Sequence, residues 1–218
     1  MTLVIEPVGA QERARGLAAA STALRRGELV VLPTDWMYGL AADAFSARGT
    51  EALRAAKGRP DLVVPVMVPS AATVAGIAVV GPTARVLMRD FWPGGLTLLL
   101  PAQPTLAWTL SDDRGRVAVR MPLHPLALDL LARTGPLGVV AAAAGQPQDG
   151  PSVLAAVGPA AAVLLDAGPL PPGPSSAVVD LCGPEPRLVR PGPLDVVALR
   201  EACPDLVIPA HGTAGIAP

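Results

Sequence analysis

The sequence is poor in aromatic, cysteine and histidine residues. Phe, Trp and Tyr together make up 3% of its 218 residues, whereas hydrophobic residues as a whole make up 51%. The core must therefore be aliphatic, built mainly from Ala, Val and Leu. The two Cys and two His are too few and too scattered for a structural zinc site, and a disulfide framework is not indicated.

Long hydrophobic runs are also missing. No stretch approaches the length of about 18 apolar residues that a membrane span needs. The N-terminal segment contains Glu6 and Glu12 and lacks an apolar core, so it does not read as a signal peptide. We therefore expect a soluble cytoplasmic protein that does not bind membranes, with both thiols free in a reducing compartment.

Charge of one sign does not dominate either. The formal net charge of −1 argues against a general nucleic-acid binder but leaves room for a local basic patch. The phosphate-loop motif Gly-x-x-x-x-Gly-Lys-Ser/Thr, the dinucleotide motif Gly-x-Gly-x-x-Gly and the nucleophile elbow Gly-x-Ser-x-Gly are absent. Any nucleotide site must therefore be built in another way.

Short apolar runs alternate with amphipathic segments, and 26 Pro and 22 Gly provide frequent stops. Interleaved strands and helices predict an α/β fold with a mixed sheet. We expect one domain over residues 1–205 and a C-terminal tail over residues 206–218. The expected strands cover residues 29–32, 63–68, 96–100, 117–121, 137–142, 163–166, 177–181 and 187–190, the last two as a hairpin. The expected helices cover residues 11–26, 50–57, 71–78, 82–90, 125–133 and 194–202.

Polar groups follow the apolar strand at residues 29–32. Pro33 lacks an N–H and stops the strand, and Thr34, Asp35 and Tyr38 then supply a hydroxyl, a carboxylate and a phenol. Because α/β sheets build sites at the carboxyl ends of their strands, this turn is a candidate site. An ordinary Pro/Asp turn is the alternative interpretation.

Four cations stand at the ends of predicted elements. Lys57 and Arg59 flank Gly58, whereas Arg120 and Arg190 each end an apolar strand and precede a Pro-containing turn. An Arg at a fixed turn is positioned to bind phosphate or carboxylate through two parallel hydrogen bonds. Four converging cations would suit a polyphosphate, although each one alone is also compatible with a solvated surface position.

Several motifs follow one another along the chain. They are Pro33-Thr34-Asp35-x-x-Tyr38-Gly39-Leu40, Lys57-Gly58-Arg59-Pro60, Phe91-Trp92-Pro93-Gly94-x-Leu96-Thr97, Val119-Arg120-Met121-Pro122, and Val179-Asp180-Leu181 with Leu188-Val189-Arg190-Pro191-Gly192. In order and spacing, these motifs resemble the short form of the YrdC-type threonylcarbamoyl-AMP synthase family. The resemblance extends over about residues 10–200.

This resemblance implies a twisted open sheet with flanking helices around a large, positively lined cavity. It implies a nucleotidyltransferase that converts L-threonine, bicarbonate and ATP into threonylcarbamoyl-AMP and pyrophosphate. In the family, that product serves the threonylcarbamoyladenosine modification of tRNA, which a separate downstream transferase completes. RNA binding by the family is a further option, which the net charge of −1 weakens here.

The resemblance also implies roles for matching residues on the nucleotide side. Lys57 and Arg59 would act in catalysis and contact the triphosphate of ATP, with Mg²⁺ carried by the nucleotide and no metal site on the protein. Thr97 and Arg190 would hold the nucleotide. We expect Arg59→Ala to weaken ATP binding markedly.

On the amino-acid side, Thr34 and Arg120 would bind threonine, the guanidinium taking its carboxylate with two hydrogen bonds. Tyr38 would form a wall of the threonine pocket. Asp35 is expected to orient the turn rather than to act as a base.

Three departures from the family pattern remove polar groups near the amino acid. Trp36 and Met37 replace the usual Thr-Val, Val64 stands where relatives often have His or Asn, and the usual Ser-x-Asn is missing around Ala141–Ala144. Two alternatives therefore stay open beside the synthase. One is a divergent paralogue that adenylates another carbamate or amine, and the other is a non-catalytic relative that binds nucleotide or RNA.

Overall fold

The computed structural model describes residues 1–106, 108, 110–112, 114–142 and 149–209. Within these residues, ten strands form one mixed sheet. The strands are β1 (Leu3–Ile5), β2 (Leu29–Pro33), β3 (Tyr38–Asp43), β4 (Val66–Met67), β5 (Leu96–Pro101), β6 (Arg116–Arg120), β7 (Leu137–Ala141), β8 (Ala161–Leu165), β9 (Ala177–Asp180) and β10 (Arg187–Arg190). The predicted α/β class with a mixed sheet is confirmed.

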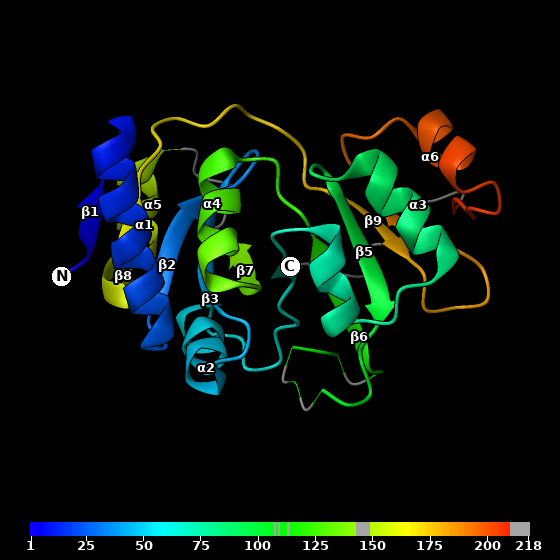
Figure 1. The fold of residues 1–218 in the computed structure, drawn as a ribbon, viewed down its shortest axis with the longest axis horizontal. Coiled ribbons are helices and arrows are strands. Elements are labelled where there is room, and N and C mark those ends of the chain that lie inside the picture. Colours follow the sequence, from blue (N-terminus) through cyan, green and yellow to red (C-terminus); the bar gives the residue numbers. More distant parts are fainter. Residues whose placement is uncertain (107, 109, 113, 143–148, 210–218) are drawn as a thin grey trace.

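The order of strands across the sheet is β1-β8-β2-β3-β7-β4-β6-β5-β9-β10. Strands close in sequence are often far apart in the sheet, and the chain from β8 to β9 crosses from one half to the other (Figure 1). The predicted hairpin is confirmed, because β9 and β10 pair antiparallel.

Helices cover both faces of the sheet (Figure 1). They are α1 (Gly9–Arg25), α2 (Ala47–Ala56), α3 (Pro82–Phe91), α4 (Pro125–Thr134), α5 (Gly150–Val157) and α6 (Val196–Ala202), with 3₁₀ turns η1 (Ala71–Gly76) and η2 (Gly158–Ala160). In the described part of the chain, no helix is both long and apolar enough to cross a membrane.

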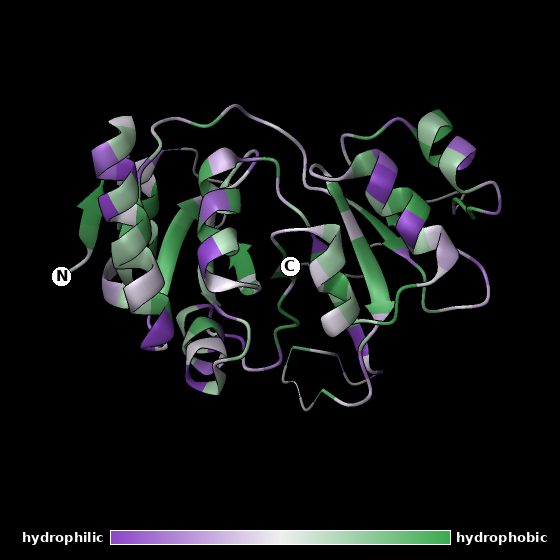
Figure 2. Cartoon of the chain, viewed as in Figure 1, coloured by the Kyte–Doolittle hydropathy of each residue, from purple (hydrophilic) through white to green (hydrophobic). Residues whose placement is uncertain are grey.

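The apolar side chains of β2 pack into two separate hydrophobic cores, one on each face of the sheet. Leu29 and Val31 pack on the face that also holds Leu53 of α2, whereas Val30 and Leu32 pack on the face of α1 and α4. Burial on both faces explains why this strand is apolar throughout rather than alternating. In Figure 2 the strands are largely hydrophobic, whereas the helices carry both hydrophobic and hydrophilic residues.

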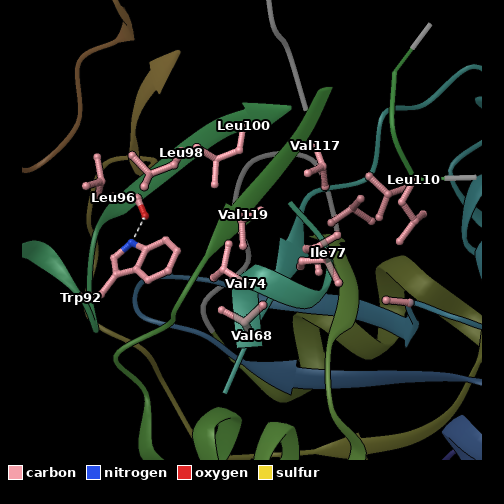
Figure 3. Packing of buried hydrophobic residues seen from close by; sticks show 14 of the residues in the cluster. Val68, Val74, Ile77, Trp92, Leu96, Leu98, Leu100, Leu110, Val117 and Val119 are labelled. Carbon is pink, nitrogen blue, oxygen red and sulfur yellow. Dashed lines mark hydrogen bonds between the residues drawn. The ribbon is translucent and has the colours of Figure 1, made fainter. Parts of the chain in front are cut away.

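The larger core continues under the second half of the sheet. Leu96, Leu98 and Leu100 of β5 pack beside Trp92, whose indole N–H donates to the Leu96 carbonyl (2.8 Å; Figure 3). This bond satisfies the one polar group of the ring, so the buried indole costs little. Aliphatic residues provide almost all of the surrounding contacts, as the composition predicts.

Several predicted elements differ in extent from the observed ones. The strand predicted for residues 63–68 is limited to Val66–Met67, because Pro65 cannot donate to a neighbouring strand. Residues 71–76 form a 3₁₀ turn instead of an α-helix. Strands β1 and β3 and helix α5 were not predicted.

The chain stays packed beyond the predicted domain limit at residue 205. Val207 accepts a hydrogen bond from Leu188 N (2.9 Å) and donates one to Pro186 O (2.9 Å), and Leu206 is buried. Residues 210–218 of the predicted tail lie outside the described residues. The domain limits themselves stay a prediction.

Candidate active site

One row across the sheet carries three of the predicted site residues. Thr97 lies opposite both Arg120 and Val178, and Val178 lies opposite Arg190. Residues that face each other in neighbouring strands point to the same side of a sheet. The Thr97 hydroxyl and two guanidinium groups, separated by up to 93 residues in sequence, therefore share one face.

Ser176 joins two members of this row. Its hydroxyl lies 2.8 Å from the Thr97 hydroxyl, and its carbonyl accepts from Arg190 Nε (3.0 Å). Arg190 Nη2 also donates to the Ser176 hydroxyl (3.3 Å). Sequence reasoning missed Ser176. A polar Ser pair between a Pro-rich loop and a strand was the available signal.

Arg120 is held from two sides. Its Nε donates to the Gly94 carbonyl (3.0 Å), and its Nη2 forms an ion pair with Asp35 Oδ2. The other oxygen of Asp35 accepts from the backbone N–H groups of Leu123 (2.7 Å) and His124 (3.2 Å). Asp35 thus links the turn after β2 to Arg120 and to the start of α4, which agrees with the orienting role predicted for it.

The positive charges of Arg120 and Arg190 outnumber the negative charges that contact them. Burial and the nearby positive charge of Arg190 lower the pKa of Arg120 to about 10, and burial lowers the pKa of Arg190. With a pKa of about 10, Arg120 stays charged at neutral pH. Two neighbouring cations and one carboxylate leave excess positive charge that a bound anion would stabilise.

A second group of predicted residues lies at the end of β7. Lys57, just after α2, donates from Nζ to the Ala141 carbonyl (3.0 Å). Ala141 pairs with Gly39, and a Cβ at Gly39 would lie 3.4 Å from Thr34 Cγ2. Thr34 closes its own turn, because its hydroxyl donates to the Met37 carbonyl (2.6 Å). Lys57 and Thr34 therefore approach the same strand pair.

The model for Sua5, YciO and YrdC proteins, described as "Telomere recombination", matches residues 22–192. The chain belongs to this family.

Curated family members are similar over most of the chain. A Mycobacterium tuberculosis protein, provisionally named a threonylcarbamoyl-AMP synthase, is 42% identical over 206 residues, which cover 92% of this chain and 95% of the relative. The Bacillus subtilis threonylcarbamoyl-AMP synthase is 35% identical over 184 residues, covering 81% of this chain and 53% of that protein.

Solved structures of the family show the same fold. Pyrococcus abyssi Sua5 complexed with L-threonine has a TM-score of 0.85 and 28% identity, and the match covers 95% of this chain and 62% of that one. Escherichia coli YciO has a TM-score of 0.79 at 24% identity, covering 90% of this chain and 97% of that one, and supports the fold alone.

Two of the residues that match family motifs, Arg59 and Tyr38, lie outside the row of Thr97, Arg120 and Arg190. Arg59 is exposed, and its backbone N–H donates to Arg54 O (3.1 Å). Tyr38 is fully buried. Its hydroxyl lies 2.7 Å from the Gly168 carbonyl and 3.0 Å from Asp166 Oδ1, and it accepts from Ala167 N (2.9 Å). Contacts of Arg59 with ATP and of Tyr38 with threonine stay predictions.

The departures from the family pattern have different structural settings. Val64 is fully buried in the larger core, so it is a packing residue. Trp36 is half-buried beside the site, with its ring centroid 6.0 Å from Arg120 Cζ. Of the window that lacks Ser-x-Asn, residues 143 and 144 lie outside the described residues.

Proposed function

We propose that this protein is an L-threonylcarbamoyladenylate synthase, which makes threonylcarbamoyl-AMP and pyrophosphate from L-threonine, bicarbonate and ATP. The observation that carries the proposal is the pair of guanidinium groups on one row with Thr97, that of Arg120 largely buried and that of Arg190 half-buried. The names of the curated relatives support the same reaction.

The chemistry asks the protein to gather anions. The threonine amine and bicarbonate condense to a carbamate with loss of water. A carbamate oxygen then attacks the α-phosphorus of ATP, a new P–O bond forms, and the bond to pyrophosphate breaks. Such transfers depend on positioning and charge neutralisation more than on covalent participation by the protein.

We assign the amino-acid side to Arg120 and Thr34. Arg120 is fixed by Gly94 and Asp35, so its remaining N–H groups are pre-oriented for the threonine carboxylate. Thr34 closes the turn that contains Asp35, and Asp35 forms the ion pair with Arg120. This turn therefore lies next to Arg120. Tyr38 supports this side by fastening residues 166–168 to β3.

We assign the nucleotide side to Arg190, Thr97, Lys57 and Arg59. Arg190 and Thr97 share Ser176, which fixes their relative position. Lys57 lies at the end of β7, and Arg59 follows it by two residues. Their charges would meet the phosphates as negative charge shifts to the leaving pyrophosphate.

Magnesium fits this site as part of the substrate rather than as a resident ion. The buried carboxylate that contacts the row, that of Asp35, is already paired with Arg120 and with two backbone N–H groups. We therefore infer that Mg²⁺ arrives bound to ATP, where it would share the neutralisation of the phosphates with Lys57 and Arg59.

The product would then need a second protein. A carbamoyl adenylate is an activated acyl donor, so a separate transferase would move the threonylcarbamoyl group to adenosine in tRNA. RNA binding by this chain is not required for the proposed step.

The test is pyrophosphate release from Mg-ATP by the purified protein. We expect release that requires both L-threonine and bicarbonate. Release without threonine, or no release with all three substrates, would overturn the assignment.

A divergent paralogue is the second candidate, and Trp36 favours it. A large ring beside Arg120 stands where the family usually has a small polar residue, which would change the space for the amine substrate. Release of pyrophosphate with another amine, but not with L-threonine, would select this candidate.

A further inference from the structure

Residues 167–176, which we call the strap, connect β8 to β9 and cross between the two halves of the sheet (Figure 1). Both of its ends are fastened next to predicted site residues. At the first end, Tyr38 binds Ala167 and Gly168 through its hydroxyl. At the second end, Ser176 contacts Thr97 and Arg190, and Ala177 N donates to Gly95 O (2.8 Å).

The middle of the strap rests on the indole of Trp36. A Cβ added at Gly173 would lie 2.0 Å from Trp36 Cδ1 and 2.4 Å from its Nε1, so the glycine backbone lies directly against the five-membered part of the indole ring. No side chain fits at residue 173 unless the ring or the strap moves. The backbone of Gly173 is not in the left-handed region, so space rather than conformation requires glycine here.

The other contacts of the ring belong to the site. A Cβ added at Gly95 would lie 3.2 Å from Trp36 Cη2, and the Arg120 guanidinium lies 6.0 Å from the ring centroid. Gly95 precedes β5 by one residue, and its carbonyl accepts the hydrogen bond from Ala177 N, directly after the strap. The indole is therefore wedged between the strap, the start of β5 and Arg120.

We propose that Trp36 is a positioning residue that sets the place of the strap, and through Ser176 the place of Arg190 and Thr97, by packing against the backbone of Gly173. The indole of Trp36 fills the space that a side chain at residue 173 would need, so the two residues are complementary in size. This inference rests on the proposed function only where its test measures enzyme activity.

The test uses two substitutions, one at residue 173 and one at residue 36, that each change the packing between the strap and the indole. Gly173→Ala should displace the strap and reduce kcat/KM for threonine-dependent pyrophosphate release roughly tenfold to a hundredfold, the range expected when site groups shift by about 1 Å. Trp36→Thr makes room for a side chain at residue 173. In the Trp36→Thr background, Gly173→Ala should therefore cost less than about threefold.

Gly183→Ala is the matched control. Residue 183 lies in the turn between β9 and β10, the nearest atom to an added Cβ is 3.8 Å away, and its backbone is not left-handed. This variant should keep the wild-type kcat/KM. A loss as large as that of Gly173→Ala would contradict a specific role for the strap contact.

Hydrogen exchange provides a readout that needs no substrate. Gly173→Ala should speed amide exchange in residues 167–177 at least about tenfold while exchange in α1 and α4 stays unchanged. The Trp36→Thr/Gly173→Ala protein should exchange like Trp36→Thr alone. A Gly173→Ala protein with wild-type exchange in the strap would overturn the inference.

The two proposals fail in different ways. If wild-type protein releases no pyrophosphate with threonine but the exchange pattern holds, the proposed function is wrong and the strap contact stands. If wild-type protein is active and Gly173→Ala keeps its kcat/KM, the positioning role of Trp36 is wrong and the proposed function stands.

Discussion

At the scale of single residues, Arg120 and Arg190 differ in how their charges are balanced. Arg120 has a carboxylate partner in Asp35. The hydrogen bonds of Arg190 go to the neutral carbonyl and hydroxyl of Ser176, and no ion pair joins it to a carboxylate within the described residues. We therefore expect Arg190 to contribute more net charge to anion binding than Arg120 does.

Arg190→Ala should raise the dissociation constant of Mg-ATP about tenfold to a hundredfold, because a hydrogen bond to a charged group contributes roughly 1.5–3 kcal/mol. Isothermal titration calorimetry measures this directly. Arg85→Ala, at an exposed position of α3, is the control and should keep wild-type affinity. If the Arg190→Ala protein binds Mg-ATP with wild-type affinity, the phosphates do not bind at Arg190.

Asp35→Ala should lower the free energy of unfolding by about 3–5 kcal/mol, because the buried Arg120 charge loses its partner. Urea denaturation measures the loss. The double variant Asp35→Ala/Arg120→Met removes both charges and should be more stable than Asp35→Ala alone. A double variant no more stable than the single one would mean that the backbone bonds of Asp35, rather than the ion pair, dominate.

Tyr38 gives a pH dependence with a defined sign. Burial and the neighbouring Asp166 raise the pKa of its hydroxyl, so the folded state keeps a proton that the unfolded state loses near pH 10. The stabilisation is fully present below about pH 10 and declines as the pH rises further. Since the chain has one tyrosine, tyrosinate absorbance reports this group alone. Tyrosinate that forms near pH 10 in the folded protein would contradict the buried hydrogen-bonded phenol, and Tyr38→Phe should flatten the slope of stability against pH.

At the scale of elements, α2 delivers Lys57 to the end of β7. Ser46 caps the start of the helix, because its hydroxyl accepts from Gly49 N (3.0 Å), and Lys57 directly follows the last helical residue, Ala56. The sequence indicated this helix only from residue 50, because the Ala-Arg-Gly-Thr start carries little hydrophobic pattern. The cap, however, was readable as a Ser ahead of the helix.

Ser46→Ala should reduce the free energy of unfolding by about 1 kcal/mol through loss of the N-cap. Because Lys57 lies at the opposite end of α2, Mg-ATP affinity should change less than about twofold. Thermal denaturation and calorimetry on the same protein separate the two effects. A large loss of affinity with unchanged stability would mean that Ser46 acts on the site rather than on the helix.

Other elements were missed for identifiable reasons. Strand β3 starts at Tyr38-Gly39 directly after a polar turn, and a glycine there favours a loop interpretation. Helix α5 begins Gly-Pro-Ser, which is typical of a turn, although Asp149 caps it by accepting from Ser152 N (2.8 Å). In both cases long-range pairing and packing overrode a weak local signal.

At the scale of the whole molecule, the site is assembled from segments that are distant in the chain. Apolar runs predicted eight of the ten described strands, and the cations at the ends of apolar runs predicted Arg120, Arg190 and Lys57 as candidate site residues. Sequence patterns could not show that Thr97 and Arg190 share Ser176, or that Trp36 faces Gly173, because both contacts depend on the path of the strap.

The most direct test of the account is mass spectrometry of the nucleotide product formed from Mg-ATP, L-threonine and ¹³C-bicarbonate. We predict an adenylate that contains both threonine and the labelled carbon, together with one pyrophosphate per adenylate. An adenylate that lacks the label or threonine, or no adenylate at all, would contradict the account.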